Sequence, residues 1–528
     1  MNEIKRCQQI ARLKEGEFDL LVVGGGATGL GTAVDAAQRG YRVALVERAD
    51  FGKGTSSRST KLVHGGVRYL KQGNLGLVRD ALRERGRLLE NAPHLARSQT
   101  FVIPAYSQAE RIFYGLGLKA YDFLAGSWSL GKSLFLDRRE TLEHLPTLLP
   151  SGVQGGVLYH DGQFDDTRMT TNLAQTAVEL GGTVANYCEC VRLLSDTTGS
   201  LTGAMIRDVV DGGEYAVRAK VVINATGVFA DTLRQQEKAG TPPLVAVSQG
   251  IHVVLPKRFL PGGSALMIPK TADGRVLFTV PWHDAVVVGT TDTPMPEAVV
   301  EPRALPEEYD FVMTHAAKYL AHAPQDGDVL SVFAGLRPLV QAGRERHTAT
   351  LSRDHTIAIG RSGMVTVTGG KWTTYRQIAQ EVVDHAEKVG GWSHRPSGTT
   401  NLPVHGAVGC APFANHRLAI YGSDAAGIAL WEREGVGESA RIHPELECSV
   451  AEVRWHASHE MAMTVEDVLS RRTRALLLNA RAAAAAAPAV AAILKNALGR
   501  TAGWAEQQVT DFRALAQGYL PPGTLSSQ

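Results

Sequence analysis

A glycine cluster near the start of the chain has the spacing of a dinucleotide-binding turn and consists of Gly24, Gly26 and Gly29. It follows the apolar run 18–23 and precedes a segment that reads as a helix to about residue 39. In such a turn the first glycine permits the tight bend, the second lets the backbone approach a pyrophosphate, and the third packs the helix against the strand. Glu47 ends the next apolar run, 41–46, where a carboxylate suits a ribose hydroxyl and repels a 2′-phosphate. This context indicates a bound dinucleotide, and because no second such motif follows in the sequence, FAD is slightly favoured over NAD.

A second stretch, residues 55–70, combines small hydroxyl side chains with basic ones and a glycine pair. Its hydroxyls and backbone N–H groups suit the diphosphate and ring edge of a flavin, and the glycines let the backbone approach a flat ring. An ordinary surface loop is the alternative. The residues expected to contact the cofactor here are Thr55, Ser56, Ser57, Lys61, His64 and Gly65, with Arg68 and Tyr69 beside them.

Two junctions between an apolar run and a glycine turn carry further cofactor candidates. The run 221–223 ends in Ala225, Thr226 and Gly227, and the run 364–368 ends in Gly369, Gly370, Lys371 and Thr373. The N–H groups of a helix that begins after the second junction would stabilise negative charge on a reduced flavin. Lys371 would add a point charge for the flavin or the substrate. A purely structural turn is the alternative.

Arg337 lies between Gly335 and Pro338, and the proline holds the residue before it extended. A guanidinium aimed by a rigid backbone suits the bidentate binding of a phosphate, although an isolated surface arginine would have the same pattern.

His252 is the candidate general base, because its reference pKa lies near neutrality. It stands in a run expected to form a strand, where a lone histidine is more often structural. Thr291 ends the second strand of an expected hairpin and would border the same pocket. Asp165 and Asp166 read as loop or helix-cap groups. The sequence contains no Walker A motif, no H-E-x-x-H and no nucleophile elbow, so redox chemistry is favoured over hydrolysis and no metal site is expected.

The elements that must position these residues follow from the apolar patterns. Residues 18–50 predict a βαβ unit, and residues 275–292 predict an antiparallel hairpin. Helices are expected over residues 75–97, 308–322 and 373–389. Residues 396–409 read as a linker before a mostly helical tail, whose clearest helix is expected over residues 465–483.

The bulk composition is that of a soluble globular protein, and more than one domain is expected because 528 residues exceed a single core. The net charge of +2 argues against bulk nucleic-acid binding. Five cysteines, an odd number at low density, imply no disulfide framework and favour a reduced, cytoplasmic compartment. The first residues lack an apolar signal core. The alanine-rich run 481–494 is interrupted by Pro488 and predicts an ordinary helix or two, so no transmembrane helix is expected.

Taken together, the segments GGGATGLG, TSSRSTKLVHGGVRYL, INATG, GTTD, GLRPL and TGGKWTTYR resemble the FAD-dependent glycerol-3-phosphate dehydrogenases and occur in that family's order. The resemblance implies an α/β fold: a Rossmann-like FAD-binding domain, an antiparallel-sheet substrate domain of the glutathione-reductase and amino-acid-oxidase kind, and a C-terminal helical domain. The implied boundaries are an N-terminal extension (1–17), a body (18–395) and a C-terminal domain (396–528). Within the body, the FAD half covers about 18–95, 150–245 and 350–395, and the substrate half about 96–149 and 246–349.

The resemblance also implies roles for single residues. Those that match family positions near the substrate are Arg68, Tyr69, His252, Arg337, Arg353 and Lys371. Arg337 and Arg353 are similar to ligands of the phosphate and hydroxyls, whereas His252 and Lys371 are similar to acid/base or charge-stabilising groups. His355 stands where the family often has tyrosine, so the hydroxyl contact expected at this position is in doubt.

The implied reaction is oxidation of glycerol 3-phosphate to dihydroxyacetone phosphate by hydride transfer to FAD, with electrons passed to a membrane quinone. The family further implies a cytoplasmic protein attached peripherally to the inner face of the membrane. Residues 79–124 are the candidate contact surface, and ordinary packed helices are the alternative for this stretch. A homodimer is considered, with the oligomeric state left open. The remaining alternatives are an oxidase that uses oxygen, a flavin amine or amino-acid oxidase, and a dinucleotide-binding module without catalytic activity.

Overall fold

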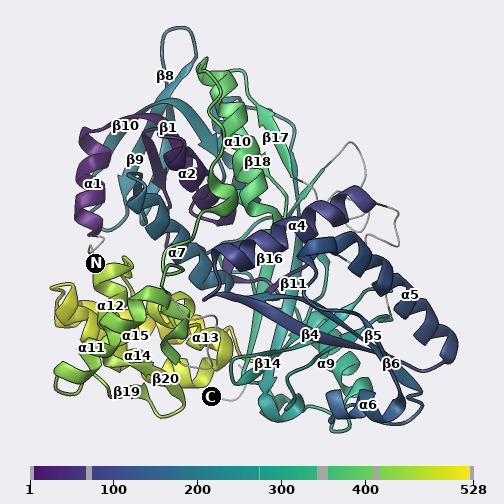
Figure 1. Cartoon of the computed structure of the whole chain (residues 1–528). Helices are drawn as coiled ribbons and strands as arrows, with labels where there is room; N and C mark the ends of the chain where they lie inside the picture. The colour runs from purple at the N-terminus through teal and green to yellow at the C-terminus, as the bar shows by residue number, and fades with distance from the viewer. Residues whose placement is uncertain (1–4, 67–73, 273, 342–354, 410–416, 524–528) are drawn as a thin grey trace.

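The computed structural model describes residues 5–66, 74–272, 274–341, 355–409 and 417–523. Figure 1 shows three regions: a sheet with helices on its faces at the top, a second sheet below it, and a helical C-terminal domain, coloured yellow-green, beside both. The expected arrangement of two mixed sheets followed by a helical domain is confirmed.

The first sheet has eight strands, and its central part is parallel. β1 pairs in parallel with β2 on one side and with β10 on the other, and β10 pairs in parallel with β18. Helices α2 and α10 pack against each other over this sheet, as Figure 1 also shows. The strands are β1 (Glu17–Val23), β2 (Val43–Val46), β7 (Thr183–Ala185), β8 (Cys188–Ser195), β9 (Leu201–Asp208), β10 (Glu214–Asn224), β17 (Thr356–Ile359) and β18 (Val365–Thr368).

The order of these elements puts the carboxyl ends of β1, β2, β10 and β18 at one edge of the sheet. β1 is an apolar run buried on both faces, as expected of a central parallel strand. α2 (Ala27–Gln38) follows β1 at once, and Gly40, with φ +78°, ends the helical path before β2. The predicted βαβ unit is therefore confirmed, and it brings the glycine turn to the edge where ligands bind in such sheets.

The second sheet has ten strands and is mostly antiparallel. Its strands are β3 (Leu62–Val63), β4 (Ala96–Ala105), β5 (Leu134–Leu136), β6 (Gly155–Phe164), β11 (Val245–Pro256), β12 (Ala265–Ile268), β13 (Leu277–Trp282), β14 (Ala285–Gly289), β15 (Thr293–Met295) and β16 (Ser331–Val340). The predicted hairpin is β13 and β14, whose turn is closed by the pair Trp282–Ala285. β6 pairs with β4 in this sheet, although residues 150–245 were expected in the FAD half, so residues 155–164 lie outside the half to which they were assigned.

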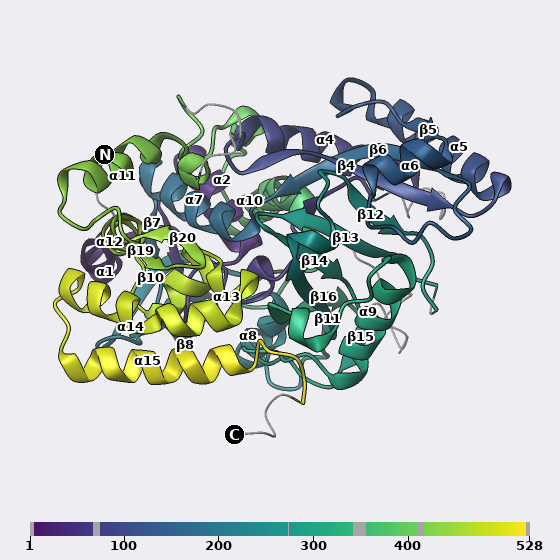
Figure 2. The same ribbon diagram turned by 90° about the horizontal axis from the view of Figure 1, so that it is seen from below.

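The remaining helices cover the two sheets or form the C-terminal domain. Helices of the body are α1 (Arg6–Glu15), α4 (Leu75–Asn91), α5 (Gln108–Ala125), α6 (Arg138–His144), α7 (Asp166–Glu179), α8 (Ala230–Glu237), α9 (Pro306–Tyr319) and α10 (Tyr375–Gly390). The C-terminal domain contains α11 (Ala425–Glu434), the short strands β19 (Arg441–His443) and β20 (Leu446–Ser449), α12 (Val450–His459), the π-helical turn η9 (Asp467–Arg472), α13 (Ala475–Leu478), α14 (Ala480–Ala497) and α15 (Ala502–Gln517). Seen from below in Figure 2, α14 and α15 lie side by side along one edge of the molecule.

The single helix expected over residues 465–483 is wrong, because the chain breaks it twice. Arg474 adopts a left-handed conformation with φ +59°, and Asn479 is extended and caps α14 through Ala482 N. Arg471, before the first break, and Arg474, at the break, form buried ion pairs with Asp50 and Asp165 of the body. Helical periodicity in the sequence does not indicate such distant partners. The run 481–494 lies inside α14, which continues through Pro488. Among the described residues, no helix is long and apolar enough to cross a bilayer.

Candidate flavin and substrate site

A cavity of about 380 Å³ opens at the carboxyl edge of the first sheet, around the glycine turn. The four strand ends that meet there supply most of its predicted cofactor residues. Those that line it are Gly24, Gly26, Glu47, Thr55, Ser56, Ala225, Thr226, Gly227, Gly369, Gly370 and Lys371. Residues that lie far apart in the sequence are thus brought to one place by the parallel strand order.

Each glycine of the turn meets a different geometric demand. Gly24 has φ +114°, and a Cβ on Gly29 would lie 1.9 Å from Gly24 O, so α2 packs too closely on the turn for any side chain there. Among the described residues other than its two chain neighbours, only Ser56, with Oγ at 3.1 Å, would have an atom within 4 Å of a Cβ on Gly26. Gly26 therefore faces open space, next to the positive end of α2. This open backbone at a helix start fits a dinucleotide pyrophosphate.

Glu47 is held by two backbone donors at the end of β2. Its Oε2 accepts from Gly25 N at 2.7 Å, and its Oε1 accepts from Ala49 N at 2.9 Å. Burial raises the pKa of Glu47 above its ordinary value, and the two N–H donors oppose that rise. The carboxylate is fixed in the cavity wall, where a ribose hydroxyl is expected.

A second cavity, of about 340 Å³, lies between the first sheet's edge and the second sheet. It is lined by the predicted residues His64, His252, Thr291, Arg337, Lys371 and Thr373. The two cavities share wall residues, namely Thr55, Arg58, Leu336, Pro338, Gly370, Lys371 and Trp372. Because they share these walls, the dinucleotide cavity adjoins the cavity that holds the candidate substrate residues.

Arg337 projects from β16 and is already oriented by the second sheet. Its Nη1 lies 3.2 Å from Asp292 Oδ1 and 3.3 Å from Gln249 O, and its Nη2 donates to Thr290 Oγ1 at 3.1 Å. The side chain remains 25% exposed, so one side of the guanidinium faces the cavity. Thr291 also lines this wall, but its hydroxyl donates to Glu308 Oε1 at 2.9 Å.

His252 lies on β11, as predicted, and its ring is buried against Phe333 with 4.8 Å between ring centroids. Its Nε2 is 2.9 Å from Thr60 Oγ1. Burial, together with the charges of Lys61 and Arg337, lowers the pKa of His252 well below its ordinary value. The imidazole is therefore neutral at physiological pH, which is the form that can accept a proton.

Four predicted cofactor residues line neither cavity: Gly29, Ser57, Lys61 and Gly65. The side chain of Lys61 faces neither cavity, because its buried Nζ pairs with Asp166 Oδ1 at 2.7 Å and donates to Ser57 O at 2.6 Å. Gly65 donates its N–H to Tyr121 Oη at 2.7 Å, so it packs behind the cavity wall.

The predictions for Arg68, Tyr69 and Arg353 lie outside the described residues. His355 Nε2 pairs with Glu381 Oε2 at 2.9 Å.

Sequence reasoning missed several residues at these walls. Arg58 lines both cavities and pairs with Glu301 at 2.7 Å, and Thr60 contacts the histidine. Asp292 was noted only as part of the hairpin end, yet it orients Arg337. Arg58 and Thr60 stand within the hydroxyl-rich stretch, so that stretch was the signal that pointed to them.

The comparisons with known proteins agree on one family. Residues 19–376 match the model of the FAD dependent oxidoreductases, and residues 364–509 match the C-terminal domain of alpha-glycerophosphate oxidase. A mitochondrial glycerol-3-phosphate dehydrogenase of Mus musculus is 40% identical over 96% of this chain and 73% of its own length. A mitochondrial glycerol-3-phosphate dehydrogenase of Arabidopsis thaliana is 40% identical over 92% of this chain and 84% of its own.

Solved structures give the same answer for the fold. The glycerol-3-phosphate dehydrogenase of Bacillus halodurans, complexed with FAD, has a TM-score of 0.80 and 27% identity, with 98% of each chain covered. The L-alpha-glycerophosphate oxidase of Mycoplasma pneumoniae, also with FAD bound, has a TM-score of 0.55 and 18% identity over 73% of this chain and 98% of its own.

Proposed function

The chain belongs to the family of FAD-dependent glycerol-3-phosphate dehydrogenases, and from that premise we propose that it oxidises sn-glycerol 3-phosphate to dihydroxyacetone phosphate and passes the electrons to a membrane quinone. The observation that carries the proposal is the shared wall between the two cavities. It puts an oriented arginine next to the cavity that fits FAD. When bound, FAD supplies the acceptor for the hydride.

In this proposal Arg337 binds the phosphate of the substrate. Its guanidinium is a fork whose planar N–H groups match phosphate oxygens, and its contacts to Asp292 and Thr290 fix its direction before substrate enters. Anchoring the phosphate leaves the glycerol end near the shared wall. The binding energy of the phosphate is then used to align the reacting carbon, which removes orientational freedom from the reaction.

Loss of hydride from the secondary carbon must be accompanied by loss of the hydroxyl proton. His252 is the group that takes this proton in our proposal, because it lines the substrate cavity in its neutral form. Thr60 holds the ring by its Nε2 contact. Lys371 lines both cavities and provides positive charge at the position where negative charge develops.

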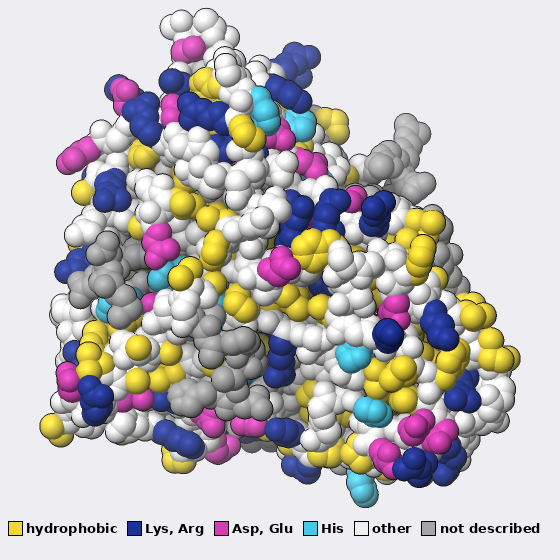
Figure 3. Space-filling view, in the orientation of Figure 1, with side chains coloured by type: hydrophobic (Ala, Val, Ile, Leu, Met, Phe, Trp, Pro, Cys, Tyr) yellow, Lys and Arg dark blue, Asp and Glu magenta, His cyan; other side chains and the backbone are white. Residues whose placement is uncertain are grey.

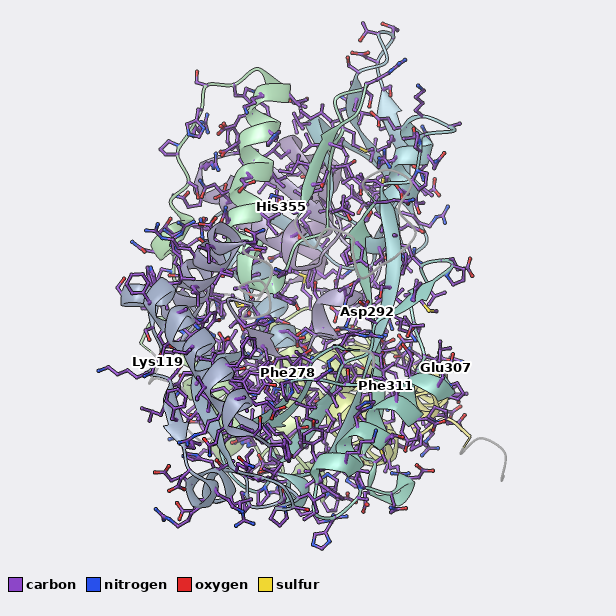
Figure 4. The ribbon with its side chains drawn as sticks, turned by 90° about the vertical axis from the view of Figure 1, so that its right-hand side faces the viewer. Lys119, Phe278, Asp292, Glu307, Phe311 and His355 are labelled. Carbon is purple, nitrogen blue, oxygen red and sulfur yellow. The ribbon has the colours of Figure 1, made fainter. Side chains whose placement is uncertain are left out.

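The proposed contact with the membrane and its quinone involves the exposed surface of α5. Its buried face contains Gly115, Leu118 and Tyr121, whereas large apolar side chains cover the opposite face. Those exposed are Ile112 (54%), Phe113 (61%), Leu116 (62%) and Phe123 (85%), with Leu134 and Phe135 of β5 next to them. Figure 3 shows this yellow patch with basic groups at its margin, and in Figure 4 Lys119 projects outward from the helix.

An apolar surface edged by lysine and arginine suits the interface of an anionic bilayer. We therefore propose that α5 and β5 lie on the inner face of the cytoplasmic membrane, where a lipid-soluble acceptor is available. The patch belongs to the second sheet, whose cavity holds Arg337, so the attached enzyme would keep its substrate cavity near the membrane.

Anaerobic mixing with candidate substrates tests the proposal. Glycerol 3-phosphate should bleach the flavin absorbance within the time of a single turnover. Glycerol and amino acids should leave the absorbance unchanged. A soluble quinone analogue should restore the colour faster than air does. Bleaching by amino acids would indicate an amino-acid oxidase, whereas peroxide formed in stoichiometric amounts in air would indicate an oxidase. Purified protein that binds no FAD would indicate a non-catalytic module.

A further inference from the structure

The loop 48–58 forms one wall of the dinucleotide cavity, and ion pairs and hydrogen bonds connect it to the C-terminal domain. The loop follows β2 and contains little regular structure beyond one 3-10 turn, η1 (Thr55–Ser57). Its Gly52 N donates to Gly25 O at 2.9 Å, so the loop lies directly on the glycine turn. Eight of its residues line the cavity: Arg48, Ala49, Gly52, Lys53, Gly54, Thr55, Ser56 and Arg58. A segment with two glycines and few backbone partners needs side-chain contacts to fix its position.

Asp50 provides the first of these contacts. Its carboxylate is fully buried and accepts from Arg471 Nε at 2.6 Å and from Arg472 Nη1 at 2.6 Å and Nη2 at 3.0 Å. Asn186 Nδ2 donates to the same carboxylate at 3.1 Å. Both arginines come from η9, the π-helical turn of the C-terminal domain, and such turns are frequent at functional sites.

Two further loop residues reach the same domain. Lys53 pairs with Glu466, the residue that precedes η9, and, at 3.0 Å, with Glu301. Arg58 pairs with Glu301 at 2.7 Å, and Tyr519 of the C-terminal domain donates to Glu301 at 2.6 Å. Three loop residues are thus connected to the C-terminal domain. Asp50 and Lys53 form ion pairs with it directly, and Arg58 is linked through Glu301, which accepts a hydrogen bond from the Tyr519 hydroxyl.

We infer that the C-terminal domain is a positioning element of the flavin site, in which Arg471 and Arg472 hold the loop 48–58 against the glycine turn through Asp50. Neither arginine lines the cavity, so both act through the loop and not by contact with the cofactor. The inference rests on FAD as the cofactor and not on the substrate or acceptor proposed above. Its consequence is that a change in the C-terminal domain loosens FAD while Arg337 and His252, which lie on strands of the second sheet, keep their positions.

The test compares two buried arginines, each held by three carboxylates. Arg471 pairs with Asp50, Glu466 and Asp467, and its side chain is 4% exposed. Arg39 pairs with Asp35, Asp384 and Glu387 at the far end of α2, is 0% exposed and lines neither cavity. Full-length Arg471→Met, Arg471→Lys and Arg39→Met proteins are stripped of FAD. The dissociation constant for FAD is then measured by quenching of flavin fluorescence, and the melting temperature is measured in parallel.

Arg471→Met should raise the dissociation constant for FAD at least ten-fold, whereas Arg39→Met should change it less than two-fold despite a similar fall in melting temperature. Arg471→Lys keeps the charge and should recover most of the affinity. Equal effects of the two methionine variants on FAD affinity would show that the loss is general instability and would overturn the inference. If Arg471→Met does not fold, Glu466→Gln, at a partly exposed position, should still weaken FAD about three-fold; unchanged affinity there would also overturn it.

These outcomes are independent of the proposed reaction. FAD binding is measured without substrate or quinone, so a chain that failed to oxidise glycerol 3-phosphate would leave the comparison of the arginines intact. On FAD-saturated Arg471→Met protein, KM for glycerol 3-phosphate should stay within two-fold of the parent, because Arg337 and its partners lie in the second sheet. A large rise in KM at saturating FAD would show that the domain acts on the substrate cavity instead.

Discussion

Arg337 Nη1 lies 3.2 Å from Asp292 Oδ1, so the guanidinium proposed to bind phosphate is oriented by a carboxylate before substrate arrives. The two residues come from β16 and from the end of the β14 hairpin, on either side of β11. A cation fixed in this way loses little conformational freedom when an anion binds, so the entropic cost of binding is small and the affinity is higher. The relationship makes the role of Arg337 measurable.

Arg337→Ala should raise KM for glycerol 3-phosphate about 100-fold, since the loss of charge-assisted hydrogen bonds to a phosphate amounts to about 3 kcal/mol. Arg337→Lys keeps the charge without the planar fork and should raise KM by about ten-fold. Steady-state kinetics with a soluble acceptor measures both. FAD content should be unchanged in each variant, and a KM within three-fold of the parent in Arg337→Ala would remove Arg337 from the phosphate site.

Gly26 and Gly29 should fail in different ways when substituted. Gly26 has an extended backbone, φ −85° and ψ −175°, which valine adopts without strain, so Gly26→Val should fold and bind no FAD. Gly29→Ala would put a Cβ 1.9 Å from Gly24 O and should lower the free energy of unfolding by about 3 kcal/mol. Circular dichroism and the ratio of flavin to protein absorbance separate the two outcomes. A yellow Gly26→Val protein would refute the placement of the pyrophosphate.

The βαβ unit, the hairpin and the strand that contains His252 were predictable because apolar patterns of period two or a strand–glycine–helix order are local signals. Gly24, Glu47, Gly227 and Gly370 were brought together correctly for a similar reason: parallel order puts strand ends at one edge. Where the neighbours of a residue in the chain determine its surroundings, the sequence was sufficient to predict its place in the fold.

Lys61 shows where such reasoning stops. Its ammonium group pairs with Asp166, 105 residues later, and nothing near Lys61 in the chain announces that partner. The break at Arg474 has the same origin, since this arginine pairs with Asp165 at 2.9 Å. Buried ion pairs between distant segments depend on tertiary packing. Basic residues that the sequence suggests as ligand contacts can therefore form ion pairs inside the protein.

His252→Gln should slow flavin reduction by about 100- to 1,000-fold with little change in KM, as expected when a general base is lost. Because burial keeps its pKa well below the ordinary value, the imidazole stays neutral and should produce no inflection between pH 6 and 8. Stopped-flow reduction across that range checks both statements. An acidic limb near pH 6.5 that disappears in His252→Gln would mean that the ring does titrate there.

His405 should contribute stability to the folded protein that is larger at pH 6 than at pH 9. It lies 2.6 Å from Glu179 and 3.0 Å from Asp424; burial alone would lower its pKa, but the two carboxylates raise it to about 9. Since the folded pKa exceeds the unfolded value near 6.5, this stabilisation is fully present below pH 6.5 and is lost as pH rises through 9. Roughly 3 kcal/mol of unfolding free energy is involved.

Urea unfolding of the parent and of His405→Gln at pH 6 and pH 9 measures this contribution. The difference in unfolding free energy between the two proteins should shrink towards pH 9. His322→Gln, at an exposed position, serves as the control and should leave the pH dependence of the parent unchanged. A constant difference between the parent and His405→Gln at both pH values would contradict the raised pKa.

The apolar face of α5 should mediate binding to membranes. Phe113 and Phe123 are 61% and 85% exposed, and replacing both with glutamate removes two apolar contacts and adds repulsion from anionic lipid. Phe113→Glu/Phe123→Glu should therefore lower affinity for phosphatidylglycerol vesicles at least about 100-fold, given about 1.5–3 kcal/mol for each buried aromatic side chain. Co-sedimentation with vesicles measures the effect.

Val436→Glu is the matched control, because Val436 is fully exposed on the C-terminal domain and the same kind of charge is introduced there. It should bind vesicles as the parent does. With a soluble acceptor the double variant should reduce its flavin at the parental rate, because α5 residues 113 and 123 line neither cavity; with a quinone embedded in vesicles its turnover should fall in proportion to binding. If the double variant still sediments with vesicles, another surface of the molecule binds the membrane, and the proposal that α5 contacts the lipid is wrong.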